Sequence, residues 1–304
     1  MRQPEGLLRR ADGWLFAAED AARLAAMRIG LCGVLALHLA VTDYRVVASQ
    51  PAALFQPVFY MKLFARMPSA GTATTLQIVG VVAAVAAAAG LALRLSLPAA
   101  LVCSLILDGM LNSAGRVIVG DAVLILCLLV VAASGPAAGE AWSLRRRRPG
   151  SAVGPRYGWP VRTAMIAIAL AYFFAGLQKW RHSGLAWLTS DNLRWILYGQ
   201  AHPGALALFV ADRPWLAHLL AGGALLLETT FPLVLFLPRL RWLFLPAAVA
   251  MQVGIRLTLG LDYSAQWLAL VIVFVDWPRA ATWARGAIVP GLASLRRDPT
   301  LRSR

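Results

Sequence analysis

The sequence predicts an all-α integral membrane protein, a bundle of about eight transmembrane helices. Of its 304 residues, 60% are hydrophobic and only 14% are charged, which is far more apolar than a soluble domain of this length. The apolar residues run continuously, without the alternation that is typical of membrane β-strands. Because the hydrocarbon core offers no water to backbone amides, such segments can span it only as helices.

Eight segments approach the length of about 20 apolar residues that a bilayer crossing requires. The predicted spans are residues 22–42, 72–93, 95–113, 117–134, 160–179, 217–237, 242–260 and 263–277. The last segment is short for a crossing, and residues 191–210 are apolar enough for a further half-buried helix. The predicted number of spans therefore carries an error of one. All spans belong to a single transmembrane domain, with a core of about residues 20–278.

The distribution of basic residues predicts the orientation, because basic loops tend to stay in the cytoplasm. With an even number of spans, eighteen lysine and arginine residues fall on the side of the termini and eight on the opposite side. Both termini are therefore expected in the cytoplasm, and the plasma membrane is the expected location.

Two basic segments lie outside the predicted spans. Residues 135–158 form a cytoplasmic linker that contains the run Arg145–Arg148, and residues 278–304 form a basic tail with a short amphipathic helix over 278–295. The net charge of +15 is spread over short loops and comes with no nucleic-acid-binding motif. We therefore expect the lipid bilayer, with its anionic head groups, as the partner and exclude nucleic acid.

Ionisable side chains inside the predicted spans are the candidates for function, because each destabilises a membrane helix unless it is paired or faces water. Glu228 lies in the middle of the sixth span, and Lys179 ends the fifth span beside Gln178 and Trp180. The other candidates are Arg28 and His38 in the first span, Asp108 and Asn112 in the third, Asp121 at the start of the fourth, and Gln252 and Arg256 in the seventh.

Lys179 and Glu228 each allow two interpretations. A lysine in a poorly solvated site loses its charge easily and can act as a base, whereas a lysine at a helix end can simply extend to the head groups. A short carboxylate in mid-span cannot reach the head groups. We therefore expect Glu228 to form a buried pair with Arg28, Lys179 or Arg256, either catalytic or purely structural.

The sequence predicts no metal site. His38 lies near the outer end of its span, where a hydrogen-bonded packing residue is expected rather than a ligand, and the other three histidines are scattered in or beside one outer loop. Cys32, Cys103 and Cys127 fall within spans without metal-ligand spacing, so they are expected to be small packing residues.

Aromatic residues mark the long outer connection over residues 181–215. They are Trp187, Trp195, Tyr198 and Trp215. Because tryptophan and tyrosine are enriched at membrane interfaces, the connection is expected to lie on the interface or to dip into it. Alternatively, it covers a cavity that faces the lipid.

Residues 172–188, YFFAGLQKWRHSGLAWL, resemble the signature of the HTTM family, the transmembrane domain shared with vitamin K-dependent gamma-carboxylase. In that signature a tyrosine-phenylalanine, an alanine-glycine and a lysine precede a tryptophan. Arg28 in AAMRIGLCG is similar to the arginine of the family's first span, and LNSAGRVIVGDAVL resembles its Asn to Gly-Asp turn. Glu228 before a proline and the closing LALVIVFVDW also resemble the family, so the resemblance covers about residues 20–278.

The resemblance implies a role for Lys179. In the carboxylase, the lysine of this motif is thought to act as the base on a reduced vitamin K quinol, whose oxygenation drives proton abstraction from a glutamate side chain. By this match Lys179 is the candidate base and a reduced quinone is the candidate cofactor. The catalytic set is then Lys179, Glu228, Arg28 and Gln252, and the binding set is Asn112, Asp121, Trp187 and Arg256.

Two departures from the family limit this transfer. The family usually has a histidine in the seventh span, where this chain reads AVAMQVGIRLTLG and places Gln252. Glutamine forms hydrogen bonds but cannot shuttle a proton. The carboxylases also carry an extended lumenal domain that grips the substrate's propeptide, and no segment here is long enough to build one. Full glutamate carboxylation is therefore not expected.

Three classes of function remain open from the sequence. The first is an enzyme that uses Lys179 on a lipid-soluble quinol, or on a peptide supplied by a membrane or peptide partner, near the extracytoplasmic side. The second is a non-catalytic accessory protein that helps secreted peptides to mature. The third is a transporter or a quinone-handling subunit similar to DoxX-like proteins, which is the least favoured because no paired Gly/Pro-broken helices mark a midplane substrate site.

Overall fold

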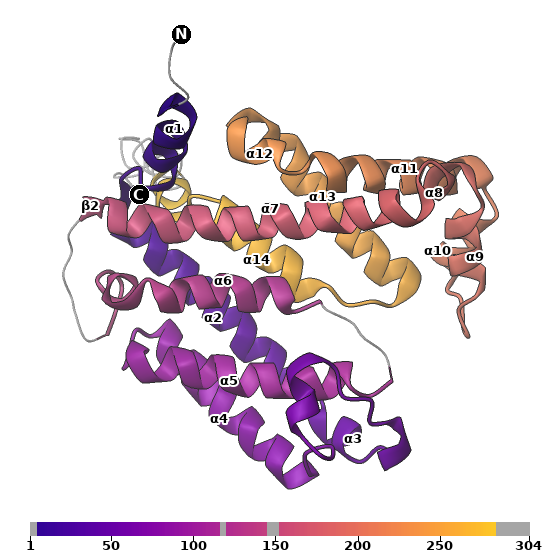
Figure 1. Cartoon of the computed structure of the whole chain (residues 1–304), viewed down its shortest axis with the longest axis horizontal. Coiled ribbons are helices and arrows are strands. Elements are labelled where there is room, and N and C mark those ends of the chain that lie inside the picture. The colour runs from indigo at the N-terminus through magenta and orange to yellow at the C-terminus, as the bar shows by residue number, and fades with distance from the viewer. Residues whose placement is uncertain (1–4, 116–119, 145–151, 284–304) are drawn as a thin grey trace, which may run out of the picture.

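The computed structural model describes residues 5–115, 120–144 and 152–283, which are almost wholly helical (Figure 1). The basic run Arg145–Arg148 lies outside the described residues, and so does most of the predicted amphipathic helix of the tail. Residues 277–283, at the start of that tail, are helical. The predicted all-α class is confirmed for the described part of the chain.

The elements have the following bounds. The α-helices are α1 (Glu5–Leu15), α2 (Ala21–Val41), α3 (Tyr44–Ala48), α4 (Ala70–Ala88), α5 (Leu93–Asn112), α6 (Ala122–Ala133), α7 (Pro155–Ser183), α8 (Ala186–Thr189), α9 (Asn192–Tyr198), α10 (Ala205–Ala211), α11 (Pro214–Thr230), α12 (Leu233–Phe236), α13 (Arg241–Leu259) and α14 (Ser264–Phe274). The 3-10 helices are η1 (Ala52–Leu54), η2 (Phe59–Leu63), η3 (Gly135–Gly139) and η4 (Pro238–Leu240). Strands β1 (Glu19–Asp20) and β2 (Val153–Gly154) pair in antiparallel orientation.

Five helices of the described residues are long and apolar enough to cross a membrane. They are α2, α4, α5, α7 and the continuous segment Pro238–Leu259, which joins η4 to α13. Helices α6 and α14 are apolar but shorter. The predicted sixth span is divided into α11 and α12 next to Pro232. Each of the eight predicted segments is thus helical, and a membrane protein is indicated, whereas the number of eight crossings stays a prediction.

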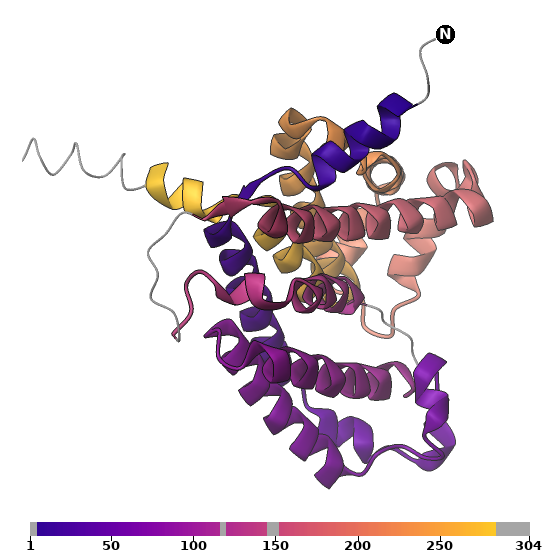
Figure 2. The ribbon, with the colours of Figure 1, turned by 60° about the vertical axis from the view of Figure 1, so that its left-hand side comes forward.

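The helices lie side by side with their ends gathered at two opposite ends of the bundle (Figure 1). We call the end that holds β1, β2 and η3 the strand end, and the end that holds α3 and α8–α10 the loop end. Helix α4 packs against α2 and α5, while α7 packs against α6 and α11, and α14 packs against α2. Figure 2 shows the same two groups of helices, with α4 and α5 below and α7 above.

Local sequence signals set several helix ends. The Asp20 carboxylate accepts a hydrogen bond from the Ala22 amide at 2.8 Å and caps α2, and Ser69 accepts one from Thr72 at 3.2 Å and caps α4. Pro155 occupies the first turn of α7, where the missing amide hydrogen leaves no bond unmade. Gly260 follows α13 with a φ of +67°, a backbone conformation that favours glycine.

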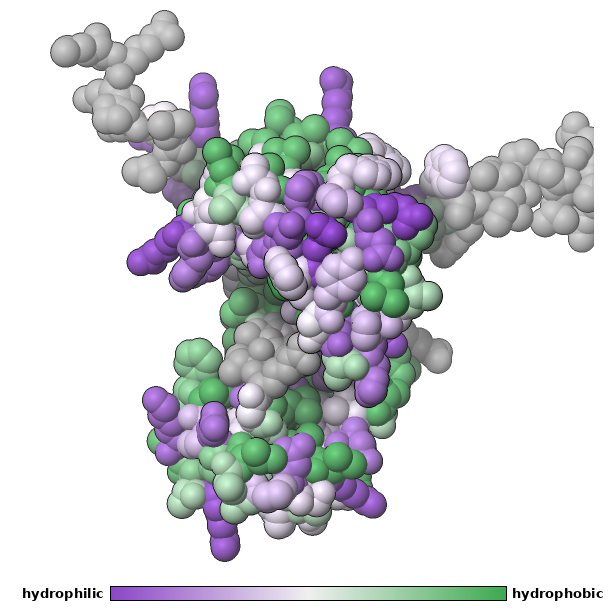
Figure 3. Space-filling view, turned by 90° about the vertical axis from the view of Figure 1, so that its right-hand side faces the viewer, coloured by the Kyte–Doolittle hydropathy of each residue, from purple (hydrophilic) through white to green (hydrophobic). Residues whose placement is uncertain are grey.

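Large apolar side chains cover much of the outer surface of the bundle. Leu37 on α2, Val82 on α4, Val102 on α5 and Leu226 on α11 are all exposed. Figure 3 looks at the loop end, where hydrophilic residues gather over both the upper and the lower group of helices. Apolar sides with polar residues at the end are the distribution expected of a bundle surrounded by lipid.

The buried side chain of Arg28 links several segments at the strand end by hydrogen bonds. Its side chain is completely buried, and its guanidinium donates to the carbonyls of Ala88 at 3.2 Å, Trp142 at 2.7 Å and Ala141 at 3.5 Å, and also to that of Ala138. Ala88 ends α4, where helix geometry leaves the carbonyl without a partner, and the other three residues lie in η3 or directly after it. The start of the predicted linker is therefore a packed part of the fold.

Replacing Arg28 by methionine keeps the apolar volume but removes every donor to these four carbonyls. Because unpaired buried carbonyls are destabilising, we expect Arg28→Met to lower the free energy of unfolding by about 3 kcal/mol. Arg94→Met, at an exposed arginine on α5, is the matched control. Unfolding in detergent, followed by tryptophan fluorescence, measures both. An Arg28→Met value within about 0.5 kcal/mol of the control would contradict the role of Arg28.

Candidate functional site

Lys179 and Glu228 form a direct ion pair between α7 and α11. Lys179 Nζ donates to Glu228 Oε1 at 2.5 Å and also to Oε2. The two residues are 49 positions apart in the chain, and their side chains are 23% and 7% exposed, respectively. Of the three partners that the sequence allowed for Glu228, the structure brings Lys179 to it. The lysine is therefore turned inward instead of extending to the surface.

Trp187 covers this pair. Lys179 Nζ lies 5.3 Å from the centroid of the Trp187 ring, a cation–π distance. Trp187 belongs to α8, in the connection that the sequence predicted to lie at the interface or to cover a cavity. Its Nε1 donor is buried and has no hydrogen-bond partner among the described residues. Because a buried N–H usually has an acceptor, this donor is available to a bound oxygen atom.

A glycine allows the two helices to approach. Tyr172, Gly176 and Lys179 are spaced by four and three residues, so they share one face of α7. A Cβ atom placed on Gly176 would lie 2.7 Å from Thr229 Cγ2 and 3.0 Å from Glu228 Cβ. These distances are shorter than van der Waals contact. The absence of a side chain at residue 176 therefore lets the backbone of α7 lie against α11 at the level of Glu228.

Polar side chains continue from the pair into the bundle. Gln252 of α13 donates from Nε2 to the Tyr172 hydroxyl at 3.5 Å, and both side chains are buried. Tyr172 also stacks on Phe231, with ring centroids 4.4 Å apart. The Oε1 atom of Gln252 is buried without a hydrogen-bond partner among the described residues. Gln252 therefore supplies a second buried polar atom without a partner among the described residues, next to Tyr172.

Four other predicted site residues do not join this group. Arg28 binds the carbonyls at the strand end, as described above. Arg256 is exposed and pairs with Asp262 at the loop end, although it lies only one helical turn from Gln252. Asn112 donates to the Asp108 carbonyl at 2.8 Å, and Asp121 lies 3.2 Å from His38. The candidate site is therefore Lys179, Glu228, Trp187, Gln252 and Tyr172.

Sequence reasoning missed Tyr172 and Gly176 as parts of the site. Both stand in the quoted motif, and their spacing from Lys179 places them on its helix face. That spacing was enough to predict that the three residues share a face of the helix. It could not predict which helix packs against that face.

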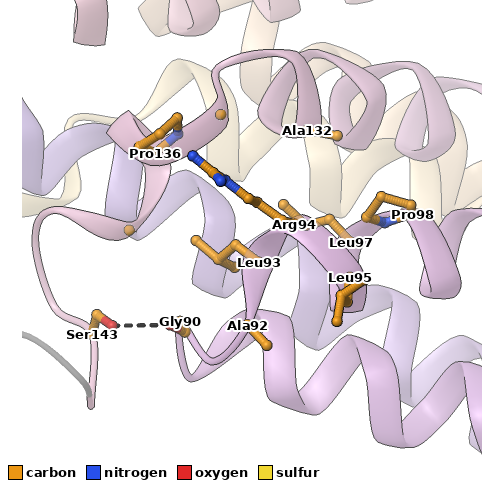
Figure 4. Close-up of a pocket in the computed structure, with 12 residues that line it drawn as sticks. Gly90, Ala92, Leu93, Arg94, Leu95, Leu97, Pro98, Ala132, Pro136 and Ser143 are labelled. Carbon is orange, nitrogen blue, oxygen red and sulfur yellow. Dashed lines mark hydrogen bonds between the residues drawn. The ribbon is translucent and has the colours of Figure 1, made fainter.

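A separate cavity of about 640 Å³ lies at the strand end (Figure 4). It is bordered by the start of α5 and by η3, and the Arg94 side chain extends across it toward Pro136. Ser143 Oγ donates to the Gly90 carbonyl at 3.0 Å beside it. The lining contains none of the five residues of the candidate site. This cavity therefore lies apart from the candidate site, in the region where Arg28 forms its hydrogen bonds.

The fold and the site define a helical bundle of the membrane type that holds a shielded lysine–glutamate pair. Comparisons of the chain with protein-family models, with curated proteins and with solved structures find no match. The resemblance to the HTTM family therefore rests on the sequence motifs alone.

Adding a methyl group at Gly176 tests the close approach of α7 and α11. We expect Gly176→Ala to force the helices apart and to destabilise the protein by about 1–3 kcal/mol, as overpacked cores do. The matched control is Gly223→Ala on α11, where an added Cβ meets no atom within 4 Å. That change should be neutral or slightly stabilising, because alanine favours helix. Equal stabilities of the two variants in detergent unfolding would refute the proposed contact.

Proposed function

We propose that this chain is an HTTM-like membrane protein whose Lys179–Glu228 pair accepts and returns a proton at a lipid-soluble quinol. The observation that carries the proposal is the ion pair itself, which is largely buried and lies beside Trp187, whose Nε1 has no hydrogen-bond partner among the described residues. A structural pair would need no such free atom beside it. Largely buried ion pairs in apolar surroundings are candidates for functional sites.

The pair can generate a base without any other group. In poorly solvated surroundings the proton of the lysine ammonium can pass to the carboxylate, which leaves a neutral amine beside a neutral acid. The amine then takes the proton of a quinol hydroxyl, and the quinolate anion stays beside the new ammonium. Trp187 Nε1 can donate to a quinol oxygen, and Gln252 Oε1 can accept from the second hydroxyl.

Exposed apolar side chains near the pair in the sequence support a ligand that comes from the lipid. Phe174 and Leu177 of α7 and Leu226 of α11 are exposed close to the pair in the chain. Large exposed apolar side chains form surfaces that lipid or lipid-soluble molecules contact. This favours a quinol that enters from the bilayer over a water-soluble substrate.

We further propose eight crossings, both termini in the cytoplasm of a plasma-membrane protein, and the site near the extracytoplasmic side. In support, all eight predicted segments are helical, and α1 and residues 277–283 both lie toward the strand end (Figures 1 and 2). The excess of basic residues falls on the same side of the predicted spans. An even number of crossings accounts for both observations.

Cysteine labelling tests this orientation, because the native Cys32, Cys103 and Cys127 are all buried. Lys62→Cys and Arg94→Cys place thiols at exposed positions on opposite sides of α4. We expect a membrane-impermeant maleimide to label the Lys62→Cys variant on intact cells, and the Arg94→Cys variant only after the cells are opened. The reverse pattern would show that the orientation is wrong.

Oxygen uptake tests the base. Because a quinolate is oxidised by oxygen faster than its quinol, the protein in lipid nanodiscs should speed the conversion of a prenylated naphthoquinol and oxygen to quinone and hydrogen peroxide. A positioned base contributes about 10²- to 10⁴-fold, so Lys179→Ala should lose at least about 100-fold of the acceleration. Glu228→Gln should lose most of it, because an amide cannot take the lysine proton.

The matched control is Arg181→Ala, which removes an exposed positive charge two residues further along α7. It should keep the rate of the unchanged protein. Thermal unfolding of each variant separates loss of the base from loss of the fold. A folded Lys179→Ala variant with an unchanged rate would exclude the base and leave the accessory role as the function to pursue.

A further inference from the structure

A second polar cluster lies toward the loop end, on helices that the Lys179–Glu228 pair does not use. His38 stands near the end of α2, Asp108 in the last turns of α5, and Asp121 directly before α6. His38 Nε2 lies 3.2 Å from Asp121 Oδ2 and 3.9 Å from Asp108 Oδ1. One ligand atom from each residue lies within 4.8 Å of the other two.

No described residue donates a hydrogen bond to the Asp108 carboxylate. It is 5% exposed, and both of its carboxylate oxygens are buried without a hydrogen-bond partner among the described residues. His38 Nε2 is also buried, and neither of its contacts with the two carboxylates has hydrogen-bond geometry. Buried carboxylates in proteins are normally paired, hydrogen-bonded or bound to a metal ion.

No cationic side chain of the described residues fills this role. Neither Asp108 nor Asp121 forms an ion pair with a lysine or an arginine in the described part of the chain. Asp262, which also acts electrostatically on His38, is paired with Arg256. The fully buried Tyr44 contributes no positive charge. Two carboxylates and one imidazole therefore face one another with an excess of negative charge.

We propose that His38, Asp108 and Asp121 bind a divalent transition-metal ion. The ion would accept one imidazole nitrogen and at least two carboxylate oxygens, and it would give the buried oxygens of Asp108 the partner that they lack among the described residues. Water or a substrate oxygen would complete the coordination. The sequence did not predict this site, because the histidine and the two carboxylates belong to three separate segments of the chain.

The spacing of the three side chains fits such an ion. Neighbouring donor atoms bound at about 2.1 Å to one ion lie about 3.4 Å apart in tetrahedral geometry and about 3.0 Å apart in octahedral geometry. His38 Nε2 lies 3.2 Å from Asp121 Oδ2, which matches this spacing, and 3.9 Å from Asp108 Oδ1, which would move closer on binding. One oxygen of Asp108 and one of Asp121 lie within 4.8 Å of each other and would also approach. The mixture of imidazole and carboxylate suits Zn²⁺ or Mn²⁺ and disfavours Cu⁺, which prefers sulfur ligands.

Calorimetric titration tests the metal site. The 304-residue chain is expressed without a polyhistidine tag, purified in detergent and treated with EDTA to remove metal. It is then titrated with ZnCl₂ and with MnCl₂. We expect one ion per chain for at least one of the two metals. Asp108→Asn, which preserves the shape of the side chain, should weaken binding at least about 10- to 100-fold, the loss that even outer-shell changes produce at metal sites. His38→Gln should do the same.

Asp191→Asn is the matched control, because Asp191 is half-buried, lies 3.8 Å from His218 and already has a cationic partner in Arg194 at 2.9 Å. It should bind the metal as the unchanged protein does. An equal loss in Asp191→Asn, unchanged affinity in Asp108→Asn, or no binding of either metal would each overturn the proposal.

Thermal unfolding supplies a readout that does not depend on affinity. In EDTA, Asp108→Asn should melt at or above the temperature of the unchanged protein, because it removes an unpaired buried charge. Added metal should raise the melting temperature of the unchanged protein and leave that of the variant in place. A variant that is less stable in EDTA would show that Asp108 has a partner within the protein, and the metal site would be wrong.

Discussion

Every charge that this bundle buries needs a partner from the chain or from a ligand, because apolar helices and lipid supply no water to solvate it. Arg28 meets this requirement with backbone carbonyls, and Lys179 meets it with Glu228. Asp108 lacks a hydrogen-bond partner among the described residues. Arg28 thus holds parts of the fold together, the Lys179–Glu228 pair is the proposed site of proton transfer, and Asp108 is a proposed metal ligand.

The two ends of the bundle differ accordingly. At the strand end, the guanidinium of Arg28 joins the end of α4 to the segment after α6, so its charge is used for structure. Toward the loop end, Trp187 covers Lys179, and His38 faces two carboxylates. The unsatisfied polar atoms that matter for function thus gather away from the strand end. A stable scaffold at one end and incompletely satisfied groups toward the other are compatible, because rigid packing holds such groups in place.

Small residues and aromatic rings decide how close the reactive groups come. Gly176 lets α7 lie against α11, and this contact places Lys179 opposite Glu228. Tyr172 is held by its stacking on Phe231 and by Gln252. Where the HTTM family, which the sequence motifs resemble, usually carries a histidine, Gln252 offers hydrogen bonds but cannot shuttle a proton. The proposed proton exchange therefore rests on Lys179 and Glu228.

Composition and the lengths of the apolar segments were enough to predict a helical membrane protein, because hydrophobic burial acts on each segment separately. The cost of burying charge was also enough to single out Lys179, Glu228 and Arg28. The sequence could not predict the partners of these residues. Glu228 had three candidate cations, and Arg28 binds backbone carbonyls, which no sequence pattern marks. His38, Asp108 and Asp121 stand on three separate helices, so only the packing of α2, α5 and α6 could bring them together. Tertiary structure decided the partners because helix packing, and not spacing along the chain, sets the distances between helices.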